Sequence, residues 1–210
     1  MRSLFLLLAF VVMPAAASAE PLPQFDSIEL RSGGEVLVRY GSSQSVELVE
    51  GDRRHTRIRV EGRRLVIANC ADACPRHHAQ RVEIVAPRLE AAAIESGGTI
   101  EVGGGFPEQR AIAAAVSNGG TIDLRRLSVQ TVTATVSEGG RILARPAGRL
   151  DARISNGGVV TYWGEAAVRR SVRGGGVVAR GRPADADRPL TQLDALRPLP
   201  RIRPIPSTLE

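Results

Sequence analysis

Five short segments of this chain repeat one pattern around a pair of adjacent glycines. They read AAIESGGTIEV (92–102), AAVSNGGTIDL (114–124), ATVSEGGRILA (134–144), ARISNGGVVTY (152–162) and RSVRGGGVVAR (170–180). Their second glycines follow one another at intervals of 22, 20, 18 and 18 residues. A repeat of about 20 residues is typical of a solenoid, in which each unit buries its apolar face only against its neighbours.

Aligning the repeats on the second glycine places apolar residues in columns. Aliphatic side chains stand four positions before that glycine and two positions after it, and Ala stands six positions before it in four repeats, with Arg170 in the fifth. The two nearer columns contain Ile94, Val116, Val136, Ile154 and Val172, then Ile100, Ile122, Ile142, Val160 and Val178. Steps of two indicate a strand with one buried face. We therefore predict an all-β, parallel β-helix-like solenoid of short coils with Gly-Gly corners.

The two ends of the chain differ from the repeats. Residues 1–19 have a short positive start, an apolar stretch and a final Ala-Ser-Ala, which are the parts of a secretory signal peptide. Residues 20–181 are predicted to form the domain, with further strands between 24 and 68. Residues 182–210 are a tail rich in Pro and Arg, with one helical turn expected at 191–196. We expect an exported protein, periplasmic or secreted to the cell surface, without a membrane span in the mature chain.

The order of these features resembles a known family. The start FDSIELRSGGEVLVRYG (25–41), the serial S-x-G-G corners and the end GGVVTYWGEAAVRRSVRGGGVV (157–178) are similar to the putative auto-transporter adhesins with a head GIN domain. The resemblance covers residues 25–180. It implies a parallel β-helix-like fold on exported proteins, and it supplies no catalytic or ligand-binding residues. The residues after Gly181 are too few and too rich in Pro for the barrel of a true auto-transporter.

Charge narrows the range of partners. The formal net charge is +6, every basic side chain except the histidines is Arg, and the charges are interspersed. Arg binds phosphate, carboxylate or sulfate groups in bidentate fashion, although codon bias also explains the absence of Lys. Nucleic acid is not expected, because there is no basic run and too few aromatic residues for a stacking platform.

The chain contains two cysteines, Cys70 and Cys74, followed by His77 and His78. Two Cys and two His could form a zinc site. A disulfide closing a small loop is favoured instead, because an export signal implies an oxidising compartment. Adjacent His side chains also point to opposite sides of an extended chain. We predict the Cys70–Cys74 disulfide, no metal and no cofactor.

Catalysis is not predicted. A β-helix enzyme that cuts polysaccharides needs clustered carboxylates, whereas Asp123, Glu138, Asp151 and Glu165 are scattered among the repeats. A carbohydrate-active β-helix enzyme remains the alternative to the favoured interpretation, which is a non-catalytic, adhesin-like binding or structural module.

The candidate binding site lies in the last repeats. The column count makes Tyr162 point inward and Trp163 outward, and an exposed indole among arginines suits an acidic glycan or an envelope protein. The predicted ligand-binding residues are Trp163, Arg169, Arg170, Arg173 and Arg180. Two alternatives remain: the tail covers Trp163, or the arginines only keep the end of the stack soluble.

Overall fold

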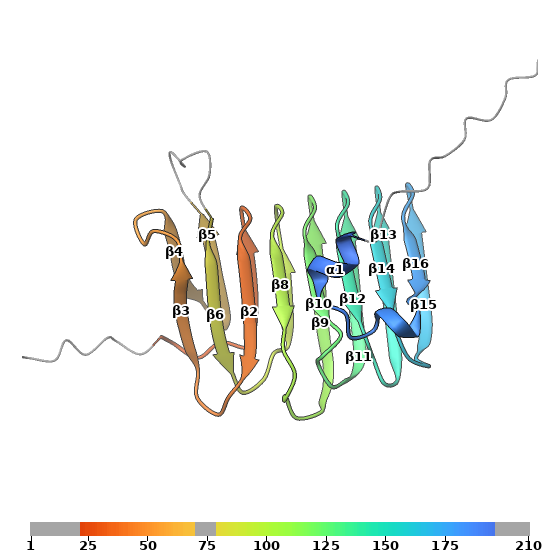
Figure 1. Ribbon diagram of the computed structural model, residues 1–210, viewed down its shortest axis with the longest axis horizontal. Coiled ribbons are helices and arrows are strands. Elements are labelled where there is room, and N and C mark those ends of the chain that lie inside the picture. Colours follow the sequence, from red (N-terminus) through yellow and green to blue (C-terminus); the bar gives the residue numbers. More distant parts are fainter. Residues whose placement is uncertain (1–21, 70–78, 196–210) are drawn as a thin grey trace, which may run out of the picture.

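The computed structural model describes residues 22–69 and 79–195, with side chains as far as residue 192. The described chain forms two eight-stranded sheets (Figure 1). In spatial order, sheet A contains β15 (Ala167–Arg173), β13 (Arg149–Ser155), β11 (Val129–Ser137), β9 (Gln109–Ser117), β7 (Ala91–Ile94), β1 (Ser27–Arg31), β5 (Arg64–Asn69) and β4 (Thr56–Glu61). Sheet B contains β16 (Val177–Arg180), β14 (Val159–Tyr162), β12 (Arg141–Ala144), β10 (Thr121–Leu124), β8 (Thr99–Val102), β2 (Glu35–Tyr40), β6 (Arg81–Ala86) and β3 (Ser45–Glu50). The predicted all-β class is confirmed.

Each repeat contributes one strand to each sheet. The strands of neighbouring repeats pair in parallel, and like residues are register partners, as in Ala114 with Ala134 and Val116 with Val136. The side chains of the aligned columns point between the sheets, where Val136 and Ile142 are fully buried. One core runs through the stack, because the side-chain period of two places every second residue on the inner face.

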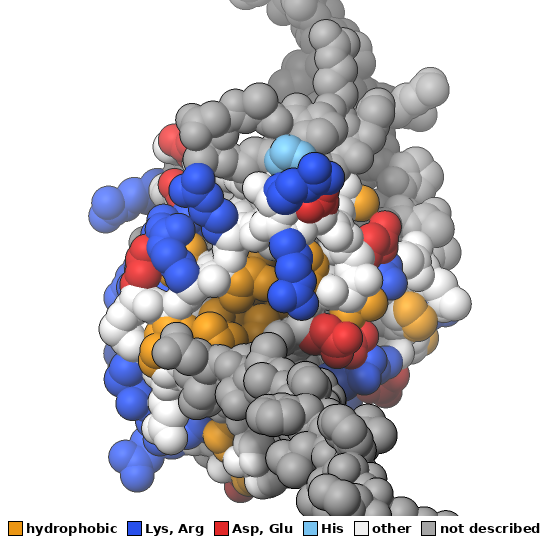
Figure 2. Space-filling model, turned by 90° about the vertical axis from the view of Figure 1, so that its left-hand side faces the viewer, with side chains coloured by type: hydrophobic (Ala, Val, Ile, Leu, Met, Phe, Trp, Pro, Cys, Tyr) orange, Lys and Arg blue, Asp and Glu red, His pale blue; other side chains and the backbone are white. Residues whose placement is uncertain are grey.

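The N-terminal strands are arranged in an order that the repeat does not predict. Strands β1 and β2 lie next to the repeats, and β5 and β6 lie outside them although they come later in the chain. The outermost strands, β3 and β4, pair antiparallel with β6 and β5. Figure 2 looks onto this end, where apolar side chains are visible among arginines and acidic residues. Val46, Leu48, Ile58 and Val60 are partly buried against the core there.

The second glycine of a corner lies directly against the preceding repeat. An ideal Cβ on Gly158, where φ is +111°, would lie 2.4 Å from Cγ1 of Val136, an inward residue of that repeat. Gly157 also has a positive φ, but its Cβ would come no nearer than 4.0 Å to a neighbouring atom, the backbone nitrogen of Gly139. The first glycine is thus required by backbone conformation alone, and the second also by the close approach of two repeats.

The chain after the last strand crosses the outer face of sheet B (Figure 1). It forms a 3-10 turn at Pro183–Asp185 and the helix α1 at Leu190–Ala195. The helical turn expected at 191–196 is confirmed, one residue earlier than predicted.

Candidate functional site

Strands β13 and β15 carry a group of arginines on the outer face of sheet A. Arg149 and Arg153 alternate with inward residues of β13, and Arg169 and Arg173 do so in β15. The parallel register places Arg169 beside Asp151 and Arg173 beside Ser155. A shallow hollow of about 230 Å³ is open to solvent and is lined by Arg149, Asp151, Arg153 and Arg169 but not by Arg173.

Arg149 neutralises the acidic residue of this group. Its guanidinium lies 2.7 Å from the carboxylate of Asp151. The hydrogen bond from Arg149 lowers the pKa of Asp151, and the nearby charges of Arg169 and Arg153 lower it further. Asp151 is therefore ionised and already bound to Arg149 at neutral pH.

Three exposed guanidinium groups remain. Within the described residues, Arg153, Arg169 and Arg173 make no side-chain hydrogen bond and no ion pair within 4 Å. An exposed Arg without a partner presents its whole fork of donors to solvent, and that fork matches carboxylate, sulfate or phosphate groups. We name Arg153, Arg169 and Arg173 the arginine face.

The other two predicted arginines, Arg170 and Arg180, do not belong to the arginine face, although Arg170 also lines its hollow. Arg170 is the register partner of Ala152 in an inward column, and it is exposed because β15 is the edge strand of sheet A in the described part of the chain. Arg180 lies in β16 of sheet B, bound to the carboxylate of Glu165 at 2.7 Å and lying 5.9 Å from the ring of Tyr162. The structure brings together only part of the predicted set.

The expectation of an exposed indole at Trp163 requires correction. Trp163 is 5% exposed and packs with Leu143, Ala186 and Leu190, so the segment after the last strand covers it. Its Nε1 donates to the carbonyl of Arg182 at 2.9 Å. An indole in this position cannot stack on a sugar ring. The alternative, that the tail covers Trp163, is confirmed.

The sequence analysis missed the residue that holds this tail. The buried Arg125 donates to both carboxylate oxygens of Asp123 and to the carbonyls of Asp185 and Ala186. Its guanidinium carbon lies 5.5 Å from the centre of the Trp163 ring. The only signal in the sequence was the spacing of two between Asp123 and Arg125, which puts both on one side of an extended chain.

The carboxylates considered for catalysis do not converge. Asp123 is buried with Arg125, Asp151 is bound to Arg149, and Glu165 is bound to Arg180. Glu138 is exposed at a corner of the backbone, with a φ of 57°. Three of these four carboxylates are each bound to a different arginine, and no two of the four are paired with each other among the described contacts.

One protein family matches the middle of the chain. Residues 94–166 match the family described as putative auto-transporter adhesin, head GIN domain. This confirms the resemblance to the head GIN adhesins seen in the sequence. The match covers four of the five Gly-Gly corners, and it includes β9 to β13. No curated protein matches the chain in sequence.

Several solved crystal structures are similar to this chain in the path of the backbone. A putative adhesin from Bacteroides fragilis is 14% identical, with 76% of this chain and 92% of that chain covered and a TM-score of 0.41. A putative adhesin from Parabacteroides merdae is 15% identical, with coverages of 77% and 93% and a TM-score of 0.36. A putative lipid binding protein from Parabacteroides distasonis is 13% identical, with coverages of 77% and 94% and a TM-score of 0.32.

Some predictions fall on other parts of the chain. The signal peptide and the Cys70–Cys74 disulfide lie outside the described residues and stay predictions. Within residues 22–69 and 79–195, no three His, Cys, Asp or Glu side chains are grouped to hold a metal ion. No helix in those ranges has the length and apolar character needed to cross a membrane.

Proposed function

We propose that this protein is an exported, non-catalytic module of the cell envelope that binds an anionic partner on the arginine face. In this proposal the two sheets are two faces of a β-helix-like solenoid, and each Gly-Gly repeat forms one coil. The observation that carries the proposal is the exposure of three neighbouring guanidinium groups without partners on two paired strands. The match to the head GIN adhesins supports an envelope location and a role in adhesion.

The arrangement of charge favours binding over a purely solubilising role. Some exposed arginines elsewhere on sheet A lie in pairs with acids, as Arg64 does with Glu29 and Arg59 with Glu61. On β13 and β15 only Asp151 is acidic, and Arg149 already occupies it. Like charges on adjacent strands repel each other. An anionic partner removes that repulsion and gains charge-assisted hydrogen bonds.

Nothing in the described structure favours the enzyme alternative. A polysaccharide-cleaving site needs two carboxylates at a defined separation across a substrate groove. Here the carboxylates of Asp123, Asp151 and Glu165 are each held by an arginine, and no two of them line the hollow of the arginine face.

The test is binding of polygalacturonate and of isolated cell envelopes to the purified protein. Arg169→Ala/Arg173→Ala removes two charges from the arginine face, and Arg39→Ala/Arg180→Ala removes the same charge from sheet B. Two exposed contacts of about 0.2–1 kcal/mol each predict a loss of affinity of roughly two- to thirtyfold in the first variant only. Binding should weaken between about 0.01 M and about 0.15 M salt, as the Debye length falls from about 30 Å to about 8 Å.

Equal affinity in the wild type and the first variant would refute the proposal. A selective loss in the Arg39→Ala/Arg180→Ala variant would place the site on sheet B. Release of shorter sugars from polygalacturonate would restore the enzyme interpretation.

A further inference from the structure

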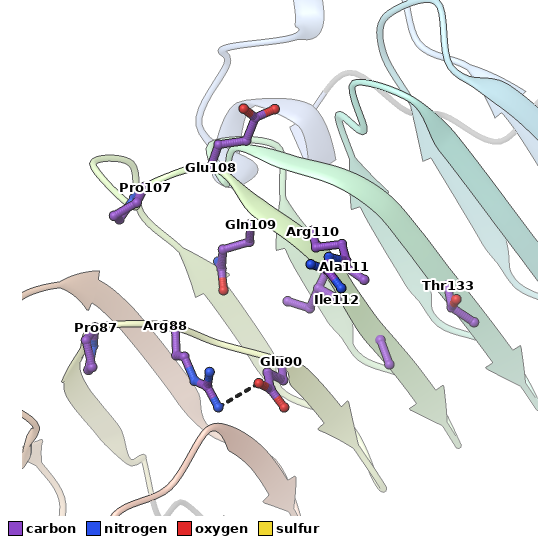
Figure 3. Close-up of a pocket in the computed structure, with 11 residues that line it drawn as sticks. Pro87, Arg88, Glu90, Pro107, Glu108, Gln109, Arg110, Ala111, Ile112 and Thr133 are labelled. Carbon is purple, nitrogen blue, oxygen red and sulfur yellow. Dashed lines mark ion pairs between the residues drawn. The ribbon is translucent and has the colours of Figure 1, made fainter.

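A second, larger hollow lies on the outer face of sheet A, beside the first half of β9 and next to the return that precedes β7 (Figure 3). Its volume is about 750 Å³, and it is lined by the returns around Pro87 and Pro107 and by Ala111, Ala113 and Thr133. The hollow forms because β9 has nine residues and β7 has four, so the register with β7 begins only at Ala113. The earlier part of β9 faces a return containing Pro87, which lacks the N–H needed to extend the sheet.

Arg110 supplies an unpartnered charge at this hollow. It is exposed, and within the described residues it makes no side-chain hydrogen bond or ion pair. The other arginine of the hollow, Arg88, lies 2.7 Å from Glu90, as the dashed line in Figure 3 marks. Glu108 accepts a hydrogen bond from Gln130. Arg110 is therefore the one guanidinium lining this hollow that is available to an anion.

The two hollows lie on one continuous surface. Thr133 lines the larger hollow, and its register partner Asp151 lines the hollow of the arginine face. The outward residues between them are small and uncharged: Ala113, Ala115, Thr133 and Thr135. We name these four residues the Ala/Thr track. Strands lie about 4.8 Å apart, so the three steps from β9 to β15 span about 14 Å. Arg169 is in register with Ala113 of β9, and Arg110 lies three residues, or about 10 Å, before Ala113, so the backbones of Arg110 and Arg169 are about 17 Å apart.

We infer that this surface binds a linear acidic polysaccharide, which crosses the strands from Arg110 over the Ala/Thr track to the arginine face. The inference rests on the proposed function and names the class of its partner. An extended polymer with repeated carboxylates can form ion pairs with Arg110 at one end of the Ala/Thr track and with the arginine face at the other. Sugar rings can lie flat on the alanines while the threonine hydroxyls meet sugar hydroxyls.

A protein partner fits this surface less well. Stable protein interfaces depend on aromatic or aliphatic anchors that fill pockets at their centre. The lining of the two hollows contains no aromatic side chain, and the only large aliphatic one, Ile112, is buried in the core. The Ala/Thr track is flat and has positive charge only at its two ends, which suits a linear polysaccharide with regularly spaced carboxylates.

The experiment measures the affinity of oligogalacturonates of increasing length, with polyglutamate as a protein-like polyanion. The variants are Arg110→Ala, Arg169→Ala and Thr133→Glu, which puts a negative charge on the track. Arg39→Ala, in β2 of sheet B, is the control for net charge. All four positions have side chains that are exposed or partly exposed, and circular dichroism checks that each variant is folded.

Arg169→Ala should weaken the binding of oligogalacturonates of every length. Arg110→Ala should weaken binding by about two- to fivefold, and only for oligomers long enough to span about 17 Å. Thr133→Glu should weaken the long oligomers, and Arg39→Ala should change none of them beyond a small effect of charge.

Two results would overturn the inference and leave the proposed function standing. One is a loss with Arg169→Ala and no loss with Arg110→Ala at any length, which would confine the site to the arginine face. The other is tight binding of polyglutamate without binding of oligogalacturonates. If neither the oligomers nor any polyanion binds, the proposed function fails as well.

Discussion

Replacing Gly158 by Ala tests why the second glycine of each corner is needed. Gly157 and Gly158 both have positive φ, at 94° and 111°, so an alanine at either position costs about 1–2 kcal/mol of backbone strain. Only at Gly158 would the new Cβ meet Cγ1 of Val136, at 2.4 Å, and the carbonyl oxygen of Gly140, at 3.2 Å. Overpacking of this kind adds about 1–3 kcal/mol.

The expected loss in the free energy of unfolding is about 2–5 kcal/mol for Gly158→Ala and about 1–2 kcal/mol for Gly157→Ala. A domain with about 5–15 kcal/mol of stability tolerates either change, so urea denaturation followed by circular dichroism can measure both. Gly157→Ala is the matched control, because it changes the same chemistry in the same corner.

A double mutant identifies the contact responsible. Val136→Ala alone removes two buried methyl groups at about 0.8 kcal/mol each, and the cavity it leaves adds to that loss. The same cavity makes room for the Cβ of Gly158→Ala. The double mutant should therefore be more stable than the sum of the single changes predicts, by about 1–3 kcal/mol. Equal costs at Gly157 and Gly158, or strict additivity with Val136→Ala, would refute the packing explanation.

Three other predictions follow from the described side chains. Glu138 has a φ of 57° at a corner where two other repeats carry Asn, so Glu138→Asn should raise stability by about 0.5–1 kcal/mol in urea denaturation; a loss would show that its strain is relieved elsewhere. Arg125→Met leaves a buried carboxylate unpaired and should cost about 3–5 kcal/mol. It should also release the tail from Trp163, the single tryptophan, so that its fluorescence shifts to longer wavelength and acrylamide quenches it more; unchanged emission would contradict the role of Arg125 as a clamp. Burial raises the pKa of Asp26, but hydrogen bonds from Arg63 and Ser27 outweigh it and hold that pKa below the usual 3.8. Because the pKa of Asp26 is lower in the folded than in the unfolded protein, its carboxylate stabilises the fold at pH values above its unfolded-state pKa, and this stabilisation is lost as the pH falls through its folded-state pKa. The melting temperature should therefore be constant from about pH 5 to 8 and fall below about pH 4. A melting temperature that rises on acidification would show that burial dominates.

The repeats were predictable because their signal is local. A side-chain period of two and a glycine pair at fixed spacing determine which residues face inward and where the chain turns. The columns that contain Val136 and Ile142 are buried as predicted and stack like on like, except that Val172, in the edge strand β15, is 41% exposed. The same local signal places Arg153, Arg169 and Arg173 outward, because each lies one step from an inward residue.

Tertiary structure decided the rest. The insertion of β1 between β5 and β7, and the antiparallel pairing of β3 and β4, depend on which unpaired edge each strand meets, and no periodicity encodes that. Trp163 is covered because a segment without strand character folds back onto sheet B, where Arg125 binds its carbonyls. The larger hollow exists because β7 and β9 differ in length. Each of these features arises between segments distant in the chain, where the free energy of packing selects among partners that the sequence pattern does not distinguish.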